Sequence, residues 1–149
     1  MPESDFKNLL NKDPFIITHF LSGTAASLSA NYGVVFNAQF NCEVMAVAAS
    51  WETASTSGTL QLEKLTGTTA PGSGNGLLTS TISTAGVANT VNHGVFFVSS
   101  TARQLVRGDR LAISDGGTLT SLVSLATTIV MKPLGKGHYN FVLGTAGNT

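Results

Sequence analysis

Residues 34–51 have the sequence VVFNAQFNCEVMAVAASW, in which apolar side chains recur at every second position. Val34, Phe36, Ala38 and Phe40 alternate with a mostly polar set. A period of two places alternate side chains on opposite faces of an extended chain. The first half of the stretch therefore predicts a β-strand with one buried face.

The second half of the stretch is apolar or small in both phases. One phase holds Met45, Val47, Ala49 and Trp51, and the other holds Val44, Ala46, Ala48 and Ser50. Strands that are buried on both faces show near-continuous apolar runs. We therefore expect a central strand here that is covered on both sides.

Outward from this stretch, the pattern from Phe15 onward is that of short strands separated by turns. Leu60 and Leu62 alternate with polar residues, and Lys64-Leu65 ends that phase. Residues 67–76 hold four glycines and a proline and predict a loop, because such a composition does not sustain a strand ladder. Further apolar segments lie at 95–98, 111–114, 119–131 and 139–143.

Turn signals separate these segments. Arg107-Gly-Asp-Arg predicts a tight turn, and Asp115-Gly-Gly predicts a hairpin turn. Roughly seven or eight short strands with so little helical periodicity predict an all-β antiparallel β-sandwich over residues 15–149. Jelly-roll and immunoglobulin-like topologies both fit, but a single cysteine excludes the Cys–Trp–Cys pattern of true immunoglobulin domains.

Residues 1–14 differ from the rest and hold five of the sixteen charged residues. Phe6, Leu9 and Leu10 stand at spacings that share one side of a helical turn. Ser4 is a suitable cap, and Asp13-Pro14 ends such a turn, because the residue before proline avoids helical angles. This segment predicts a short N-terminal arm with one helical turn, although a frayed terminus also fits.

The 149 residues carry eight basic and eight acidic side chains, so the formal net charge is zero. This balance argues against a general nucleic-acid binder and against a polybasic membrane clamp. Ser and Thr number 34, so hydroxyls provide most of the polar surface. No apolar run reaches the roughly 20 residues of a membrane span, and the start has no signal-peptide pattern. With a single cysteine, we expect a soluble protein that is made and assembled in a reducing cytoplasm.

Catalytic and metal-binding patterns are absent from the sequence. His19, His93 and His138 are far apart, and no serine lies in a G-x-S-x-G elbow. The glycine-rich loop lacks the Lys-Ser/Thr of a phosphate cradle. Arg107-Gly108-Asp109 matches an adhesion tripeptide but is better explained as a turn. These features predict no enzyme, cofactor or metal.

Two weaker candidates have structural explanations. The carboxylates of Glu63, Asp109 and Asp115 do not match an EF-hand loop, and isolated carboxylates beside turns usually bind backbone N–H groups. Cys42 has no cation beside it in the sequence, so we expect a structural thiol.

The arm and the loop are the predicted partner contacts. The arm residues Phe6, Leu9 and Leu10, with Phe15 beside them, bury little apolar surface by themselves, and each is worth about 1.5–3 kcal/mol when covered. The second candidate contact is the 67–76 loop, represented by Gly67, Pro71 and Gly74. We expect loss of residues 1–14 to abolish partner binding and to leave a folded domain.

The central block resembles a known group of virion proteins. The segments that carry the likeness are Thr59-Leu-Gln-Leu-Glu-Lys-Leu-Thr-Gly-Thr, Ala70-Pro-Gly, Gly76-Leu-Leu, Ala88-Asn-Thr-Val and Leu105-Val-Arg-Gly-Asp-Arg-Leu-Ala-Ile. Over residues 42–133 the chain resembles small capsid decoration (cement) proteins and related head modules of tailed double-stranded DNA bacteriophages. In that group an LQ(V/L)EKLTGT strand, an ANTV segment and a GDRLA turn recur in this order.

The resemblance implies a jelly-roll-like sandwich and a structural virion protein. It implies a homotrimer on the capsid exterior that bridges neighbouring subunits of the major capsid protein, with no direct contact with nucleic acid or membrane. The first alternative is a head-fibre or receptor-binding domain for host surface glycans, with Trp51, Tyr32 and Tyr139 as candidate aromatic platforms, although Trp51 fits a core position better. A small sandwich hydrolase is the second alternative.

Overall fold

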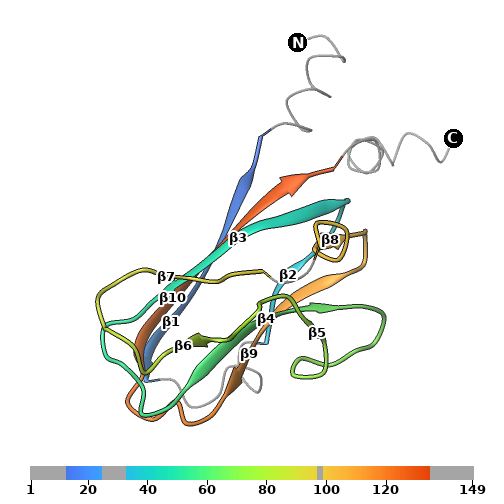
Figure 1. The fold of residues 1–149 in the computed structure, drawn as a ribbon. Helices are drawn as coiled ribbons and strands as arrows, with labels where there is room; N and C mark the ends of the chain where they lie inside the picture. Colours follow the sequence, from blue (N-terminus) through green and yellow to red (C-terminus); the bar gives the residue numbers. More distant parts are fainter. Residues whose placement is uncertain (1–12, 25–32, 97–98, 135–149) are drawn as a thin grey trace, which may run out of the picture.

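The computed structural model describes residues 13–24, 33–96 and 99–134, which form strands, turns and bends without a helix (Figure 1). The strands are β1 (Phe15–Thr24), β2 (Val34–Asn37), β3 (Cys42–Ser50), β4 (Thr59–Leu65), β5 (Asn75–Gly76), β6 (Ile82–Ser83), β7 (Asn92–His93), β8 (Gln104–Leu105), β9 (Arg110–Gly116) and β10 (Val123–Pro133). β1 begins at Phe15, the residue at which the sequence predicts the sandwich domain to start.

The prediction of an all-β antiparallel sandwich is confirmed. Sheet A has the strand order β1-β10-β3-β7, with β8 also paired to β3. Sheet B has the order β2-β9-β4-β5, with β6 also paired to β4. The two sheets lie as separate layers in Figure 1, and each buries one face against the other.

The strand pairs are nested along the chain. β1 pairs with β10, β2 with β9, β3 with β7 and β8, and β4 with β5 and β6, each time antiparallel. Successive pairs alternate between the sheets, as they do when a long hairpin is rolled up on itself. This nesting is typical of a jelly roll, and that name stays an interpretation of the strand order.

The core between the sheets is apolar and closely packed. Sheet A contributes residues such as Val47, Leu125, Ile129 and Met131, and sheet B contributes Leu60, Leu62, Leu111 and Ile113. Trp51 is 2% exposed, so the core position expected for it is confirmed. The alternating burial along β10 shows how a period of two separates core-facing from outward-facing side chains.

The expectation for β3 is half right. The strand is central, because β10 lies on one side of it and β7 and β8 lie on the other. It is not covered on both sides: Met45 is 42% exposed, whereas Val44 is fully buried. Met45 and not Val44 faces outward because the register is irregular opposite Val130 and Met131, which moves β3 out of its regular alternation.

Three local expectations need correction. Asp115-Gly-Gly does not form a hairpin, because β9 lies in sheet B and β10 in sheet A. Residues 67–76 are mostly turn and bend, but Asn75 and Gly76 pair with β4 as β5. Of the expected strand at 95–98, the described part contributes one bridge, between Leu78 and Phe96. The segment 139–143 lies outside the described residues.

Candidate functional site: the outer face of sheet A

The outer face of sheet A carries apolar side chains in register across three strands. Ile16, Val130 and Ala46 form one row, and Thr18, Thr128 and Ala48 form the next. Phe20 and Ala126 form a third row, which ends on β3 at the polar Ser50. We call the eight residues of these rows other than Ser50, together with Met45, the sheet A outer face.

This face is exposed although it is apolar. Ile16 is 65% exposed, Phe20 58% and Met45 42%. The outer side of an antiparallel sheet usually carries polar residues, because it faces water. A surface with this composition is typical of a site that another molecule covers.

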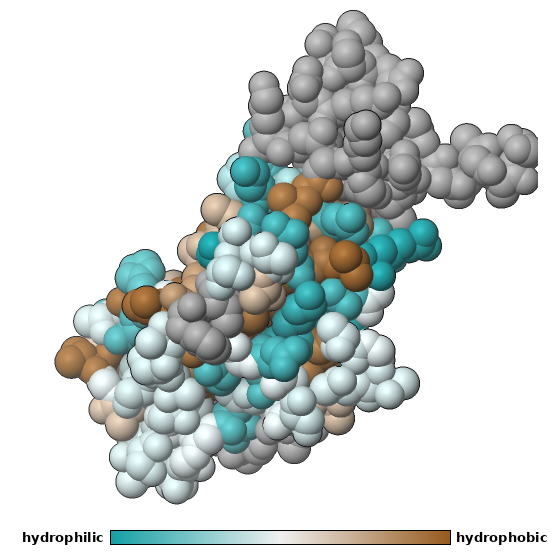
Figure 2. Space-filling view, turned by 45° about the vertical axis from the view of Figure 1, so that its right-hand side comes forward, coloured by the Kyte–Doolittle hydropathy of each residue, from teal (hydrophilic) through white to brown (hydrophobic). Residues whose placement is uncertain are grey.

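Charged residues stand at the ends of the sheet A outer face and not within it. Lys132 lies opposite Glu43 at one end, and Glu52 follows β3 at the other. The nine residues of the face itself contain no Asp, Glu, Lys or Arg. A partner that covers these nine residues therefore buries none of their side chains as a charge, while the exposed His93 of β7 lies beside Ala48 at the border of the face. On the side of the molecule seen in Figure 2, hydrophobic side chains form separate patches among hydrophilic ones.

On sheet B, the outward side of β4 is covered by another segment of the same chain. Glu63 and Leu65 are 6% and 0% exposed, although they alternate with the core-facing residues of β4. The 67–76 loop lies over them: a side chain at Gly74 would collide with Leu65, and Glu63 Oε2 accepts hydrogen bonds from the backbone N–H groups of Gly72 and Gly74. Within the described residues, sheet A has no such cover.

The 67–76 loop is fixed at its start by Arg110. One guanidinium nitrogen, Nη2, donates to the carbonyl oxygens of Gly67 and Thr69 at 3.0 and 2.7 Å. The structure therefore gives Gly74 a role in covering β4, while Gly67 is exposed and Pro71 is half-buried. That these three residues contact a partner stays a prediction.

The other predicted contacts belong to the N-terminal side of the chain. Phe6, Leu9 and Leu10 lie outside the described residues. Phe15 is the first residue of β1, and its ring packs against those of Phe36 and Phe40 at centroid distances of 6.0 and 5.6 Å. Phe15 is thus part of the sandwich itself, and contact between it and a partner stays a prediction.

Among the described residues, the adhesion-like tripeptide and the carboxylates beside turns have structural roles. Asp109 Oδ2 accepts a hydrogen bond from the backbone N–H of Val106 and lies 3.3 Å from Lys64 Nζ, so Arg107-Gly108-Asp109 forms the expected turn. Gly108 has a positive φ of 99° there. In the described part of the chain, no three His, Cys, Asp or Glu side chains come together as a metal site would require.

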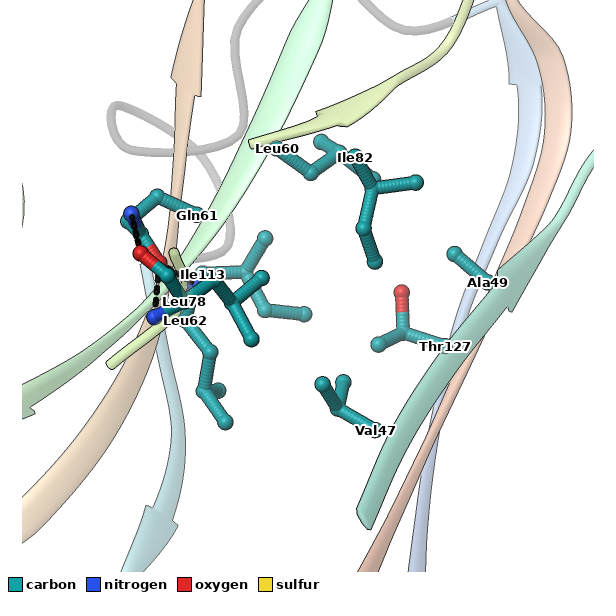
Figure 3. Close-up of a pocket in the computed structure, with 9 residues that line it drawn as sticks. All are labelled: Val47, Ala49, Leu60, Gln61, Leu62, Leu78, Ile82, Ile113 and Thr127. Atoms are coloured by element: carbon teal, nitrogen blue, oxygen red, sulfur yellow. Dashed lines mark hydrogen bonds between the residues drawn. The ribbon is translucent and has the colours of Figure 1, made fainter. Parts of the chain in front are cut away.

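Cavities in the described region are small or open. One cavity between the sheets has a volume of about 10 Å³, and its mostly apolar lining, drawn in Figure 3, includes Val47, Leu60 and Ile113. That is the lower limit for a single water molecule. A shallow hollow of about 380 Å³ lies beside Phe20, Glu52 and Asn89.

Of the aromatic residues expected to bind a sugar under the glycan alternative, the structure describes Trp51, and that side chain is buried. Trp51 borders the shallow hollow, but its ring is buried in the core. Tyr32 and Tyr139 lie outside the described residues. Trp51 therefore presents no ring face on which a sugar could stack in this conformation.

Cys42 is a free cysteine that is fully buried in this fold. Burial, together with a smaller effect of the negative charge of Asp109, raises the pKa of the Cys42 thiol to about 12. The thiolate is the reactive form, so the structural role expected for Cys42 agrees with this environment.

We expect iodoacetamide at pH 8 to leave Cys42 unmodified in the folded chain and to modify it fully in urea, as measured by mass spectrometry. Because the pKa is higher in the folded chain than in the unfolded one, the unfolded chain loses its proton first as pH rises. The contribution of Cys42 to stability is therefore present below about pH 9 and is lost as pH rises toward 12. Equal modification rates with and without urea would contradict the burial of this thiol.

The comparisons with known proteins add no relative. No family model, curated protein or solved structure matches this chain. In the described residues there is no helix of the length and apolar character that a membrane crossing needs.

Proposed function

We propose that this chain is a structural virion protein that decorates and stabilises a bacteriophage capsid. It docks through the sheet A outer face and bridges neighbouring major capsid subunits on the capsid exterior. The observation that carries the proposal is the uncharged, exposed apolar surface of Ile16, Phe20 and Met45 on a sheet that the rest of the described chain leaves open. The resemblance over residues 42–133 supplies the class of partner.

The proposed mechanism is mechanical. Packaged DNA stresses the shell, and a protein that binds across the seam between two subunits adds its binding free energy to the cost of separating them. Joining several copies strengthens such a clamp, because attachment of one copy raises the effective concentration of the others. The resemblance implies a homotrimer, and any oligomer that presents several copies to the shell would act in this way.

The predicted arm precedes the strand that forms one side of the proposed docking surface. Residues 1–14 lead directly into β1, whose outward residues Ile16, Thr18 and Phe20 form one side of the sheet A outer face. A partner that covers this side of the face therefore meets the start of β1. The arm adds apolar side chains to the contact, each worth about 1.5–3 kcal/mol when buried.

The test is co-sedimentation of the purified chain with phage heads that lack it. The unaltered chain is expected to bind at a fixed ratio to the major capsid protein. Thr128→Lys places a charge at the centre of the sheet A outer face and is expected to weaken binding at least tenfold, or about 1.4 kcal/mol. Deletion of residues 1–14 is expected to abolish binding and to leave the circular dichroism of the sandwich unchanged.

Thr81→Lys is the matched control, because Thr81 is exposed beside β6 in sheet B. It adds the same charge to the other side of the sandwich and is expected to bind normally. If Thr128→Lys decorates heads as well as Thr81→Lys does, sheet A is not the docking surface. If the unaltered chain does not bind heads at all, the proposed function is wrong.

A further inference from the structure

The two sheets differ in how their edges are protected. Sheet A ends on one side in β7 and β8, which have two residues each, and sheet B ends in β2, β5 and β6, which have four residues or fewer. Very short edge strands are a common defence against pairing with another chain. β1 is the exception: it is ten residues long, and among the described strands only β10 pairs with it.

The composition of β1 provides no protection either. Its sequence FIITHFLSGT contains no Lys, Arg, Asp, Glu or Pro, the residues that usually discourage pairing at an edge. Seven consecutive residues, Phe15 to Leu21, keep a regular register with β10, so this part of the edge contains no bulge. Apart from β10, no strand in the described ranges pairs with this long, regular and uncharged edge, and the backbone of such an edge is suited to pairing with a further strand.

The outward side chains of β1 complement a second copy of themselves. In antiparallel pairing about a two-fold axis through Thr18, Ile16 of one copy lies directly opposite Phe20 of the other, and Thr18 lies opposite Thr18. Both are favourable cross-strand pairs, one aromatic with β-branched and one of two threonines. Each of the two exposed apolar side chains thereby acquires an apolar neighbour.

The neighbouring registers lack this match. A two-fold axis through Ile17 sets Phe20 opposite Pro14, which precedes the strand, and an axis through His19 sets Phe20 opposite Thr18. An axis through Phe20 stacks the two Phe20 rings but leaves Ile16 opposite Thr24, beyond the irregularity after Leu21. The register centred on Thr18 therefore pairs the most apolar surface over the most regular part of the strand.

We propose that β1 pairs with β1 of a second copy of this chain, antiparallel and centred on Thr18. Sheet A then continues across two copies, and their outer faces join into one larger apolar surface. The pairing has two-fold symmetry, so the isolated chain forms a dimer in place of the homotrimer that the resemblance implies. The inference stands on the edge geometry and does not require a capsid as partner.

The first test is the mass of the full chain by sedimentation, with a single-site crosslink to locate the contact. We expect twice the 15.4 kDa of one chain. Opposed residues in an antiparallel pair have Cα atoms about 4.5–5.5 Å apart, which suits a disulfide. Thr18→Cys should therefore oxidise to a covalent dimer, whereas Thr128→Cys, one strand inward on the same face, should not. The native Cys42 is fully buried and does not interfere.

A pair of charge variants separates edge pairing from stacking of the faces. Thr18→Lys brings two like charges together at the axis and is expected to give a monomer, and Thr128→Lys is expected to keep the dimer. A mass of one or three chains for the unaltered protein, or a dimer in which Thr18→Cys does not crosslink, would overturn the proposal. Head binding is a separate readout: Thr128→Lys tests it without breaking the pair.

Discussion

Gly117→Ala is expected to lower the free energy of unfolding by about 3 kcal/mol, because left-handed strain and overpacking act at the same residue. Gly117 has a φ of 65°, a region that side-chain-bearing residues rarely adopt. An added Cβ would also collide with the backbone carbonyl oxygen of Ser57. Because neither the added Cβ nor the Ser57 carbonyl oxygen is the end of a flexible side chain, the backbone of the turn before β10 must shift. Urea unfolding monitored by circular dichroism measures the loss.

Gly72→Ala is the matched control for this prediction. Gly72 also has a positive φ, of 86°, but nothing lies within 4 Å of the position that its Cβ would occupy. Only the backbone strain applies there, and we expect a loss of about 1 kcal/mol. Equal losses for the two variants would show that close approach at Gly117 contributes nothing.

Arg103→Met is expected to cost about 2–3 kcal/mol, because it leaves a largely buried carboxylate without its partner. Arg103 Nη2 lies 3.3 Å from Glu43 Oε1, and Nη1 donates to the carbonyl oxygen of Val44 at 3.1 Å. The guanidinium also lies 4.9 Å from the centre of the Phe96 ring. These contacts connect the segment before β8 to β3, and urea unfolding measures their loss.

The double variant Arg103→Met with Glu43→Gln tests the cause of that cost. Glutamine removes the unpaired charge, so the double variant is expected to be more stable than Arg103→Met alone. Removal of both partners of a buried pair is generally less harmful than removal of one. If the two losses simply add, the destabilisation comes from lost packing against Phe96 and not from the carboxylate.

The class of fold could be predicted from local pattern, because a period of two is visible in residues such as Val123 to Met131. The pairing of strands could not. Phe15 lies opposite Met131, and nothing near either residue indicates the other. The turn signal at Gly116-Gly117 shows that the chain reverses, but it does not show that the next strand crosses to the opposite sheet. The hairpin expectation failed for this reason.

Single-residue irregularities limited the prediction of the candidate site. The sequence places Met45 in phase with Val47, but the irregular register of β3 turns Met45 outward and Val44 inward. The pattern of β1 does not mark Ile16 and Phe20 as surface residues, and its one signal is that both phases are apolar at the start of the strand. The covering of Leu65 by the 67–76 loop depends on Glu63 and Arg110 contacts that composition does not reveal.

The adjacency of β1 and β10 has a consequence for protein engineering. β1 starts beside the end of β10, and the turn at residues 117–122 lies at the opposite pole of the sandwich. The N-terminal and C-terminal flanks are therefore attached at one pole. Cargo fused to the two flanks would be tethered side by side, and a short linker between the flanks would suit a circular permutant opened at the distal turn.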